Sequence, residues 1–120
     1  MHSLLLISAN DREITVDALR RAFEASAKFT DVRFDTPAGT PIEATYHDGE
    51  DFTTVRLSST RTAISIRGTS GAALSAAWIL KNQLNIPLRM VDTDYSFDLT
   101  LVDFKSLEDV QLAIDRARAS

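Results

Sequence analysis

Cysteine is absent from the 120-residue sequence, and glycine and proline are scarce, with 4 and 3 residues. The lack of cysteine excludes disulfides, thiolate nucleophiles and zinc–cysteine sites, and it is typical of a reducing compartment, so we expect a cytoplasmic location. The scarcity of glycine and proline excludes collagen-like and low-complexity chains. With 44% hydrophobic and 25% charged residues, the composition predicts one globular domain over residues 1–120.

Long hydrophobic runs are also missing. The N-terminal apolar run covers only residues 4–7, which is too short for the core of a signal peptide, and it lacks a basic flank. No segment approaches the roughly 20 apolar residues that cross a bilayer. We therefore expect no membrane association, and we interpret residues 4–8 as a central strand covered on both faces.

Positive charge is in the minority, because 17 acidic residues outnumber 13 lysines and arginines and leave a net charge of −4. This balance argues against general nucleic-acid binding, which depends on cations that neutralise phosphates. The charges are also segregated along the chain. Residues 56–89 hold five basic residues and no acid, whereas residues 31–51 and 90–115 are mainly acidic.

Hydrophobic periodicity and turn signals predict the element order β-α-β-β-β-β-α-β-β-α. The expected strands are centred on residues 4–8, 32–34, 42–47, 52–58, 64–66, 88–90 and 95–101. This order predicts an α+β fold with an antiparallel or mixed sheet and about three helices packed mainly on one face. A doubly wound α/β fold needs crossover helices between strands, which the run of four successive strands lacks.

Capping and turn residues mark where the predicted elements end. Thr15 is the expected N-cap of a helix over residues 15–27, with Asn10 as an earlier alternative. Asp48 and Gly49 form the expected turn of a hairpin. The second helix is predicted over residues 71–84, after Ser70. Two further signals frame the last elements: Asn85 closes that second helix, and Ser106 caps the third.

Catalytic signatures are lacking as well. His47 precedes a tight turn, so we interpret it as an exposed turn residue rather than a proton shuttle. The turn over residues 68–71 lacks the lysine and spacing of a nucleotide loop, so no cofactor is expected. No Gly-x-Ser-x-Gly elbow is present. The sequence therefore predicts a protein without enzymatic activity.

The acids between residues 92 and 103 are spaced as in a calcium loop. However, Phe97 occupies the position that requires glycine, and the alternation around it predicts extended backbone. We expect no metal here and interpret these acids as a solvated strand face or a protein-binding surface.

Trp78 and three arginines are further candidates. Trp78 lies in an apolar helix stripe, which indicates a core residue more than a ligand contact. Arg56, Arg61 and Arg67 surround one predicted turn, where they form either a basic patch or cross-strand pairs with carboxylates. The second interpretation is favoured.

Four segments of the C-terminal half carry a family resemblance: residues 71–78 (GAALSAAW), 86–89 (IPLR), 95–99 (YSFDL) and 106–109 (SLED). The layout resembles the small acidic α+β immunity proteins of bacterial contact-dependent growth inhibition and other polymorphic toxin systems. The resemblance implies a cytoplasmic inhibitor that binds a cognate toxin domain and occludes its active or functional surface. Many such toxins are basic nucleases, so complementary potential speeds association.

The two acidic turns supply the candidate partner-binding residues. They are Asp48, Glu50, Asp51, Asp92, Asp94 and Asp98, with Tyr95 as an aromatic anchor. Two alternatives stay open: a small-molecule-binding or enzymatic domain with a pocket near Trp78, and a homodimer formed through an edge strand.

Overall fold

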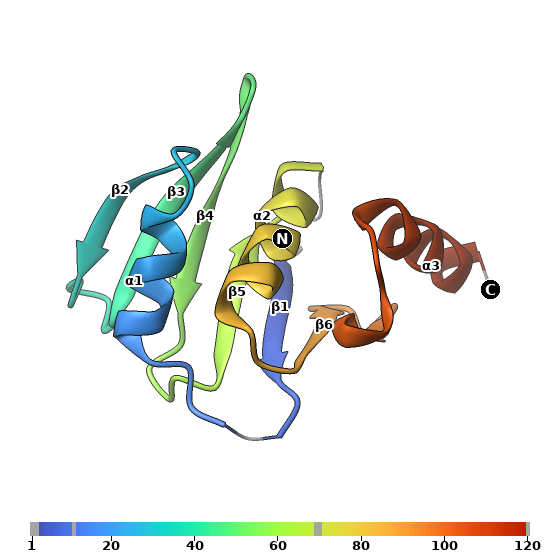
Figure 1. Ribbon diagram of the computed structural model, residues 1–120, viewed down its shortest axis with the longest axis horizontal. Coiled ribbons are helices and arrows are strands. Elements are labelled where there is room, and N and C mark those ends of the chain that lie inside the picture. Colours follow the sequence, from blue (N-terminus) through green and yellow to red (C-terminus); the bar gives the residue numbers. More distant parts are fainter. Residues whose placement is uncertain (1–2, 11, 69–70, 120) are drawn as a thin grey trace.

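The computed structural model describes residues 3–10, 12–68 and 71–119, and this part of the chain forms one seven-stranded sheet with three α-helices (Figure 1). The observed order confirms the predicted α+β fold. The elements are β1 (Ser3–Ser8), α1 (Val16–Glu24), β2 (Phe29–Phe34), β3 (Ile42–Asp48), β4 (Asp51–Leu57), β5 (Ala63–Arg67), α2 (Gly71–Leu84), β6 (Leu88–Asp92), β7 (Asp98–Thr100), the 3-10 helix η1 (Leu101–Asp103) and α3 (Leu107–Ala119).

The strands lie side by side in the order β2-β3-β4-β5-β1-β6-β7, and every neighbouring pair is antiparallel. β1 is therefore an interior strand, as its apolar run predicts. Because neighbours alternate in direction, β3 and β6 end, and β4 and β7 begin, at the same end of the sheet. We call this the hairpin end.

The hydrophobic core lies between the sheet and its helices. α1 and α2 pack against one face, which presents the fully buried Leu4, Leu6, Ile64 and Ile66 (Figure 1). α2 adds seven buried residues, of which four are alanines whose small side chains let the helix lie close to the strands. Each large apolar side chain removed from water contributes roughly 1.5–3 kcal/mol, so this layer holds the fold together.

α1 and α2 leave the opposite face of the sheet uncovered. On β1, Leu5 and Ile7 point to this uncovered face and are only half-buried. The expectation that β1 is covered on both faces is therefore wrong, because the two helices pack on one side only. Across β3, β4 and β5 the uncovered face is polar. It presents Glu43, Thr45, Thr54, Arg56, Ser65 and Arg67.

Local capping signals set the helix ends. The Thr15 hydroxyl accepts the amide of the third residue after it at 3.0 Å, which confirms Thr15 as the N-cap of α1. Asn85, with a φ of 54°, follows α2, and the Ser106 hydroxyl accepts an amide of α3 at 3.2 Å. The predicted Ser70 cap lies outside the described residues. None of the helices in the described ranges is both long and apolar enough to cross a membrane.

The segment after β6 differs from the prediction of a strand over residues 95–101. β7 has only three residues, Tyr95 has a φ of 53°, and Leu101 begins η1. The cause is Asp92, whose carboxylate accepts the backbone amide of Ser96 at 2.7 Å and thereby holds the chain in a turn. A side-chain hydrogen bond of this kind competes with strand pairing.

Candidate protein-binding surface

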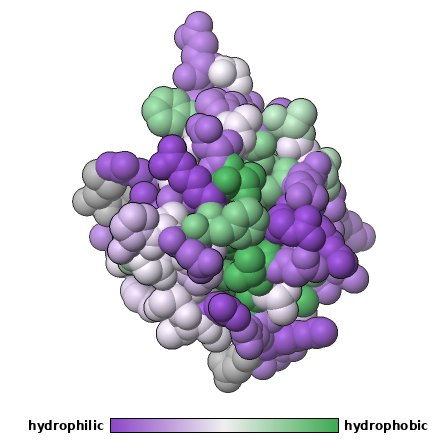
Figure 2. All heavy atoms as spheres, turned by 90° about the vertical axis from the view of Figure 1, so that its left-hand side faces the viewer, coloured by the Kyte–Doolittle hydropathy of each residue, from purple (hydrophilic) through white to green (hydrophobic). Residues whose placement is uncertain are grey.

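The β3–β4 hairpin projects from the hairpin end and carries the first group of predicted contact residues (Figure 1). Asp48 pairs with Asp51, so Gly49 and Glu50 reverse the chain, with a φ of 66° at Gly49. The prediction placed this turn one residue too early. The carboxylate of Asp48 lies 3.9 Å from the Lys28 ammonium, whereas the next two acids form no ion pair among the described residues. Figure 2 shows that the projecting tip is hydrophilic.

Asp92 ends β6 and is only 2% exposed. Its two carboxylate oxygens accept the backbone amide and the hydroxyl of Ser96, and its backbone carbonyl accepts the Tyr95 amide at 3.0 Å. Arg118 of α3 lies 3.7 Å from the same carboxylate. Burial acts to raise the pKa of Asp92, but the Ser96 hydrogen bonds and the Arg118 charge outweigh it, so the pKa lies below its ordinary value.

Asp92 therefore builds the turn and is withdrawn from any surface contact. This corrects its assignment as a partner-binding residue. The sequence places Asp92 beside polar neighbours, which suggested exposure, but its position opposite Leu4 in the sheet turns its side chain toward the helix-covered face. The turn also binds β1, because the Thr93 amide donates to the Ser3 carbonyl at 3.1 Å.

Asp98 is exposed but paired. Arg89 donates from Nε to Asp98 Oδ1 at 3.2 Å and from a terminal nitrogen to the other carboxylate oxygen. These hydrogen bonds lower the pKa of Asp98 against a smaller opposing effect of burial. Both residues lie on the uncovered face, where Asp98 is opposite Val91 and Arg89 is opposite Thr100 in the β6–β7 register. Asp98 thus contributes less negative potential than the sequence suggested.

Asp94 and Tyr95 are exposed on the turn between β6 and β7, and Tyr95 is 71% exposed. In the sheet register, Asp92 is level with Leu4, Leu4 with Ile66, and Ile66 with Val55 of β4. From Val55 to Asp51 at the tip, β4 rises by roughly 3.3 Å per residue, so the hairpin tip extends about 13 Å beyond the level of Asp92. All seven predicted residues thus lie at the hairpin end, and five of them are neither buried in the turn like Asp92 nor paired with Arg89 like Asp98. We call this set the acidic end: Asp48, Glu50, Asp51, Asp94 and Tyr95.

Two residues that shape this surface were not predicted. Ser96 closes the turn through its amide and hydroxyl, and Arg118 reaches it from the last turn of α3. The spacing of Asp92 and Ser96 is a local signal for a turn, but the apolar alternation of the following residues pointed to a strand. The contact with Arg118 spans 26 positions and has no signal in the sequence.

The other candidate residues contact neighbouring side chains. His47 is exposed, and its Nε2 lies 2.9 Å from the Thr30 hydroxyl. Arg56 pairs with Glu43 across β3 and β4 at 3.0 Å, and Arg61 pairs with Glu13 at 3.4 Å. Cross-strand pairing is therefore confirmed for Arg56. Arg61 lies in the β4–β5 turn, at the opposite end of the sheet from Arg67, so the three arginines do not form one patch.

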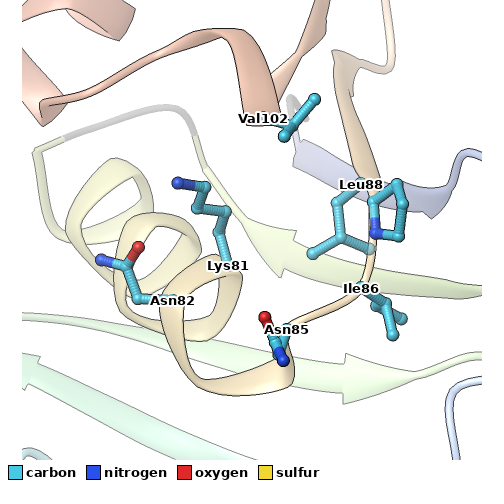
Figure 3. Close-up of a pocket in the computed structure, with 7 residues that line it drawn as sticks. Lys81, Asn82, Asn85, Ile86, Leu88 and Val102 are labelled. Carbon is cyan, nitrogen blue, oxygen red and sulfur yellow. The ribbon is translucent and has the colours of Figure 1, made fainter.

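A hollow of about 300 Å³ lies where α2 ends and β6 begins (Figure 3). Its lining combines polar side chains at and just after the end of α2, Lys81, Asn82 and Asn85, with the apolar Ile86, Pro87, Leu88 and Val102. Trp78 does not line this hollow. It is half-buried, and the Lys81 ammonium lies 4.5 Å from the centre of its ring. Lys81 therefore connects the hollow with Trp78, whereas the Trp78 ring itself does not line the hollow.

Comparisons with family models, curated proteins and solved structures find no match to the chain. The fold and the arrangement of its side chains are therefore the basis for a functional conclusion. They place exposed acids and an exposed tyrosine at one end of a sheet.

Proposed function

We propose that this protein is a non-catalytic binding protein that presents its acidic end to a basic protein partner. More specifically, we propose that it is an immunity protein, which neutralises a cognate toxin domain by covering the active or functional surface of that toxin. The observation that carries the proposal is the common location of Asp48, Glu50, Asp51, Asp94 and Tyr95 at the hairpin end.

Electrostatics favour a basic partner. Glu50 and Asp51 are exposed at the projecting tip and form no ion pair in the described part of the chain, so their charge is available to an approaching cation. Negative potential at a projecting position speeds encounter with a positively charged protein and disfavours acidic competitors.

Rigid presentation favours specific binding. Tyr95 has a positive φ, and its turn is held by hydrogen bonds to Asp92. The Asp92 carboxylate accepts from Ser96, and the Asp92 backbone carbonyl accepts from the amide of Tyr95. A turn fixed before binding loses little conformational entropy on association. Exposed tyrosines at such positions are frequent anchors of protein interfaces, because the ring buries a large area and the hydroxyl keeps a hydrogen bond.

The proposal predicts that a toxin domain is encoded beside the gene for this chain, and the test uses that domain. The purified pair is expected to bind with an affinity that falls between about 50 mM and about 300 mM salt, because screening weakens the attraction. The variant Glu50→Lys/Asp51→Lys is expected to weaken binding by at least about tenfold. Growth of cells that produce the toxin domain reports protection by the same variants.

The matched control is Glu13→Lys/Asp103→Lys. It changes the net charge by the same amount, but both residues lie at the opposite end of the sheet. We expect this control to bind within about threefold of the unmodified protein, since the added charges are more than a Debye length from the contact. Equal losses in the two variants, or no binding and no protection by the unmodified chain, would contradict the proposal.

A further inference from the structure

The hollow at the end of α2 combines one cation with an apolar wall (Figure 3). The cation is Lys81, and the apolar residues are Ile86, Pro87, Leu88 and Val102. Small-molecule sites commonly occupy roughly 300–1,000 Å³. The volume of about 300 Å³ is at the lower end of this range, so the hollow fits a small ligand.

Lys81 forms no ion pair with any described residue. Its ammonium contacts the ring of Trp78, whose centre lies 4.5 Å away. This contact occupies one side of an ammonium group that has three N–H donors. The described lining of the hollow contains no carboxylate. The donors of Lys81 that do not face the ring are therefore available to an anionic group of a ligand.

Two acids follow or neighbour the lining in the fold, and neither pairs with Lys81. Asp103 follows Val102 in η1, but it is exposed and does not line the hollow. Asp98 pairs with Arg89 on the uncovered face, whereas Leu88, next to Arg89, points to the opposite face. An exposed carboxylate such as Asp103 attracts a cation only weakly, because water screens the charge.

Val102 is an apolar side chain that is left open to water at this hollow. It is 65% exposed, although Leu101 before it is buried. Figure 3 shows Val102 and Leu88 on the side of the hollow across from α2 and Lys81. An aliphatic group bound between them would remove apolar surface of Val102 from water, which favours binding.

The end of α2 determines the direction in which such a ligand lies. The last carbonyl groups of a helix carry partial negative charge, and Asn85 directly follows α2. A carboxylate is therefore disfavoured at Asn85 and favoured at the Lys81 ammonium. Figure 3 shows the Lys81 side chain extending away from Asn85. The charged and the apolar parts of a ligand thus have separate places in the hollow.

We propose that this hollow binds a small aliphatic carboxylate, with the carboxylate on the Lys81 ammonium and the alkyl chain against Ile86, Leu88 and Val102. The site does not depend on the proposed binding of a protein partner. Leu88 is level with Ser8 of β1, at the end of the sheet opposite to the acidic end.

The experiment is a titration of the full chain with hexanoate, followed by the fluorescence of Trp78 and by amide chemical shifts in NMR spectra. Trp78 is the only tryptophan, and its ring contacts Lys81, so its emission reports on this site. Hexanoate is expected to draw the ammonium toward its carboxylate and to change the emission saturably, with shifts at Leu88 and Val102. Acetate lacks the alkyl chain and hexanol lacks the charge, so each is expected to bind at least about tenfold more weakly.

Two pairs of variants test the cation and the apolar wall. Lys81→Gln is expected to weaken hexanoate binding about tenfold. Lys28→Gln removes the same charge at the hairpin end and is expected to keep the affinity within about twofold. Val102→Asp places a carboxylate in the lining and is expected to abolish binding. Leu112→Asp replaces another exposed apolar residue, in α3 and outside the lining, and is expected to retain it.

Four results would overturn the assignment. The first is the lack of any saturable change in emission or amide shifts at millimolar hexanoate. The second is an equal loss of affinity in a variant and its control, which would indicate unspecific attraction. The third is binding of hexanol as tight as that of hexanoate, which would show that Lys81 does not select a carboxylate. The fourth is tighter binding of N-acetylleucine than of hexanoate, which would make the C-terminus of a peptide the occupant.

Discussion

The guanidinium of Arg118, in the last turn of α3, lies 3.7 Å from the carboxylate of Asp92 at the end of β6. The same guanidinium lies 5.5 Å from the centre of the Phe97 ring. These contacts join the C-terminal helix to the turn that presents Tyr95. The shape of the acidic end therefore depends on a helix that contributes no exposed residue to it.

Asp92→Asn is expected to destabilise the protein by about 2 kcal/mol, because hydrogen bonds to a buried carboxylate from Ser96, and the charge of Arg118, are lost or weakened. Chemical denaturation measures this change. The control Asp103→Asn replaces an exposed acid and is expected to stay within about 0.5 kcal/mol. Equal stability of the two variants would show that the carboxylate of Asp92 does not hold the turn.

Asp92 also makes stability depend on pH. Its pKa in the folded protein lies below the ordinary value of 3.8, so the unfolded chain binds the proton more tightly. The contribution of Asp92 is therefore complete above the unfolded pKa and is lost as the pH falls toward the folded pKa. Free energies of unfolding between pH 6 and pH 3 are expected to fall more steeply for the unmodified protein than for Asp92→Asn. Asp98, whose pKa is also lowered, contributes to the pH dependence of both proteins. Parallel curves for the two proteins would contradict the assignment to Asp92.

Much of the fold could be predicted from the sequence, because its signals are local. Alternation identified the strands of the meander, Thr15 and Asn85 marked helix ends, and the apolar run of β1 indicated an interior position. The prediction failed between Tyr95 and Leu101, where hydrophobic alternation competes with the hydrogen bond that the Asp92 carboxylate accepts from the Ser96 amide. Periodicity describes which residues are apolar and contains no information on such a bond.

The candidate surface was less predictable, because it depends on contacts between distant segments. The sequence identified the acids but could not distinguish Glu50, exposed at a hairpin tip, from Asp92, buried against α3. Burial of Asp92 follows from its register against Leu4, and pairing of Asp98 follows from Arg89 on the neighbouring strand. Both require knowledge of which strands are neighbours. The neighbourhood of Ser3 and Arg67 could not be predicted for the same reason, since it arises only from the pairing of β1 with β5.

Tyr46→Phe is expected to stabilise the protein by about 1 kcal/mol. The Tyr46 side chain is fully buried with its ring centre 4.9 Å from that of Phe29, and its hydroxyl has no hydrogen-bond partner in the described structure. Removing a buried, unsatisfied hydroxyl removes its desolvation penalty while the ring packing is kept. Thermal unfolding measures the change. A loss of stability of similar size would instead show that the hydroxyl is hydrogen-bonded in solution.

The protein is expected to be monomeric, although β2 is an exposed edge strand. Pairing of β2 with β3 shifts register between Thr30 and Arg33, and Asp31 has a φ of 52°. Such a bulge, with a charge at the edge, interrupts the row of amides and carbonyls that a second strand would need. A hydrophobic strip is visible on this side of the molecule (Figure 2), and Phe34 is 50% exposed. Light scattering measures the mass in solution and is expected to give that of a monomer. The mass of a dimer would instead favour the homodimer alternative.

Tyr95→Gly is expected to separate stability from binding. Tyr95 has a φ of 53°, a conformation that strains residues with a side chain and that glycine adopts freely. The relief of strain, reduced by the greater entropy of glycine in the unfolded chain, predicts a gain of about 0.5 kcal/mol in the free energy of unfolding. The lost ring is expected to weaken partner binding at least tenfold if Tyr95 anchors the interface, on the scale of about 2 kcal/mol for an interface hot spot.

Tyr95→Ala is the control, because it keeps the backbone strain and lacks the ring. It should bind as weakly as Tyr95→Gly without the gain in stability. Unchanged affinity in both variants, measured by calorimetry with the toxin domain, would remove Tyr95 from the contact surface and leave the acids as its basis.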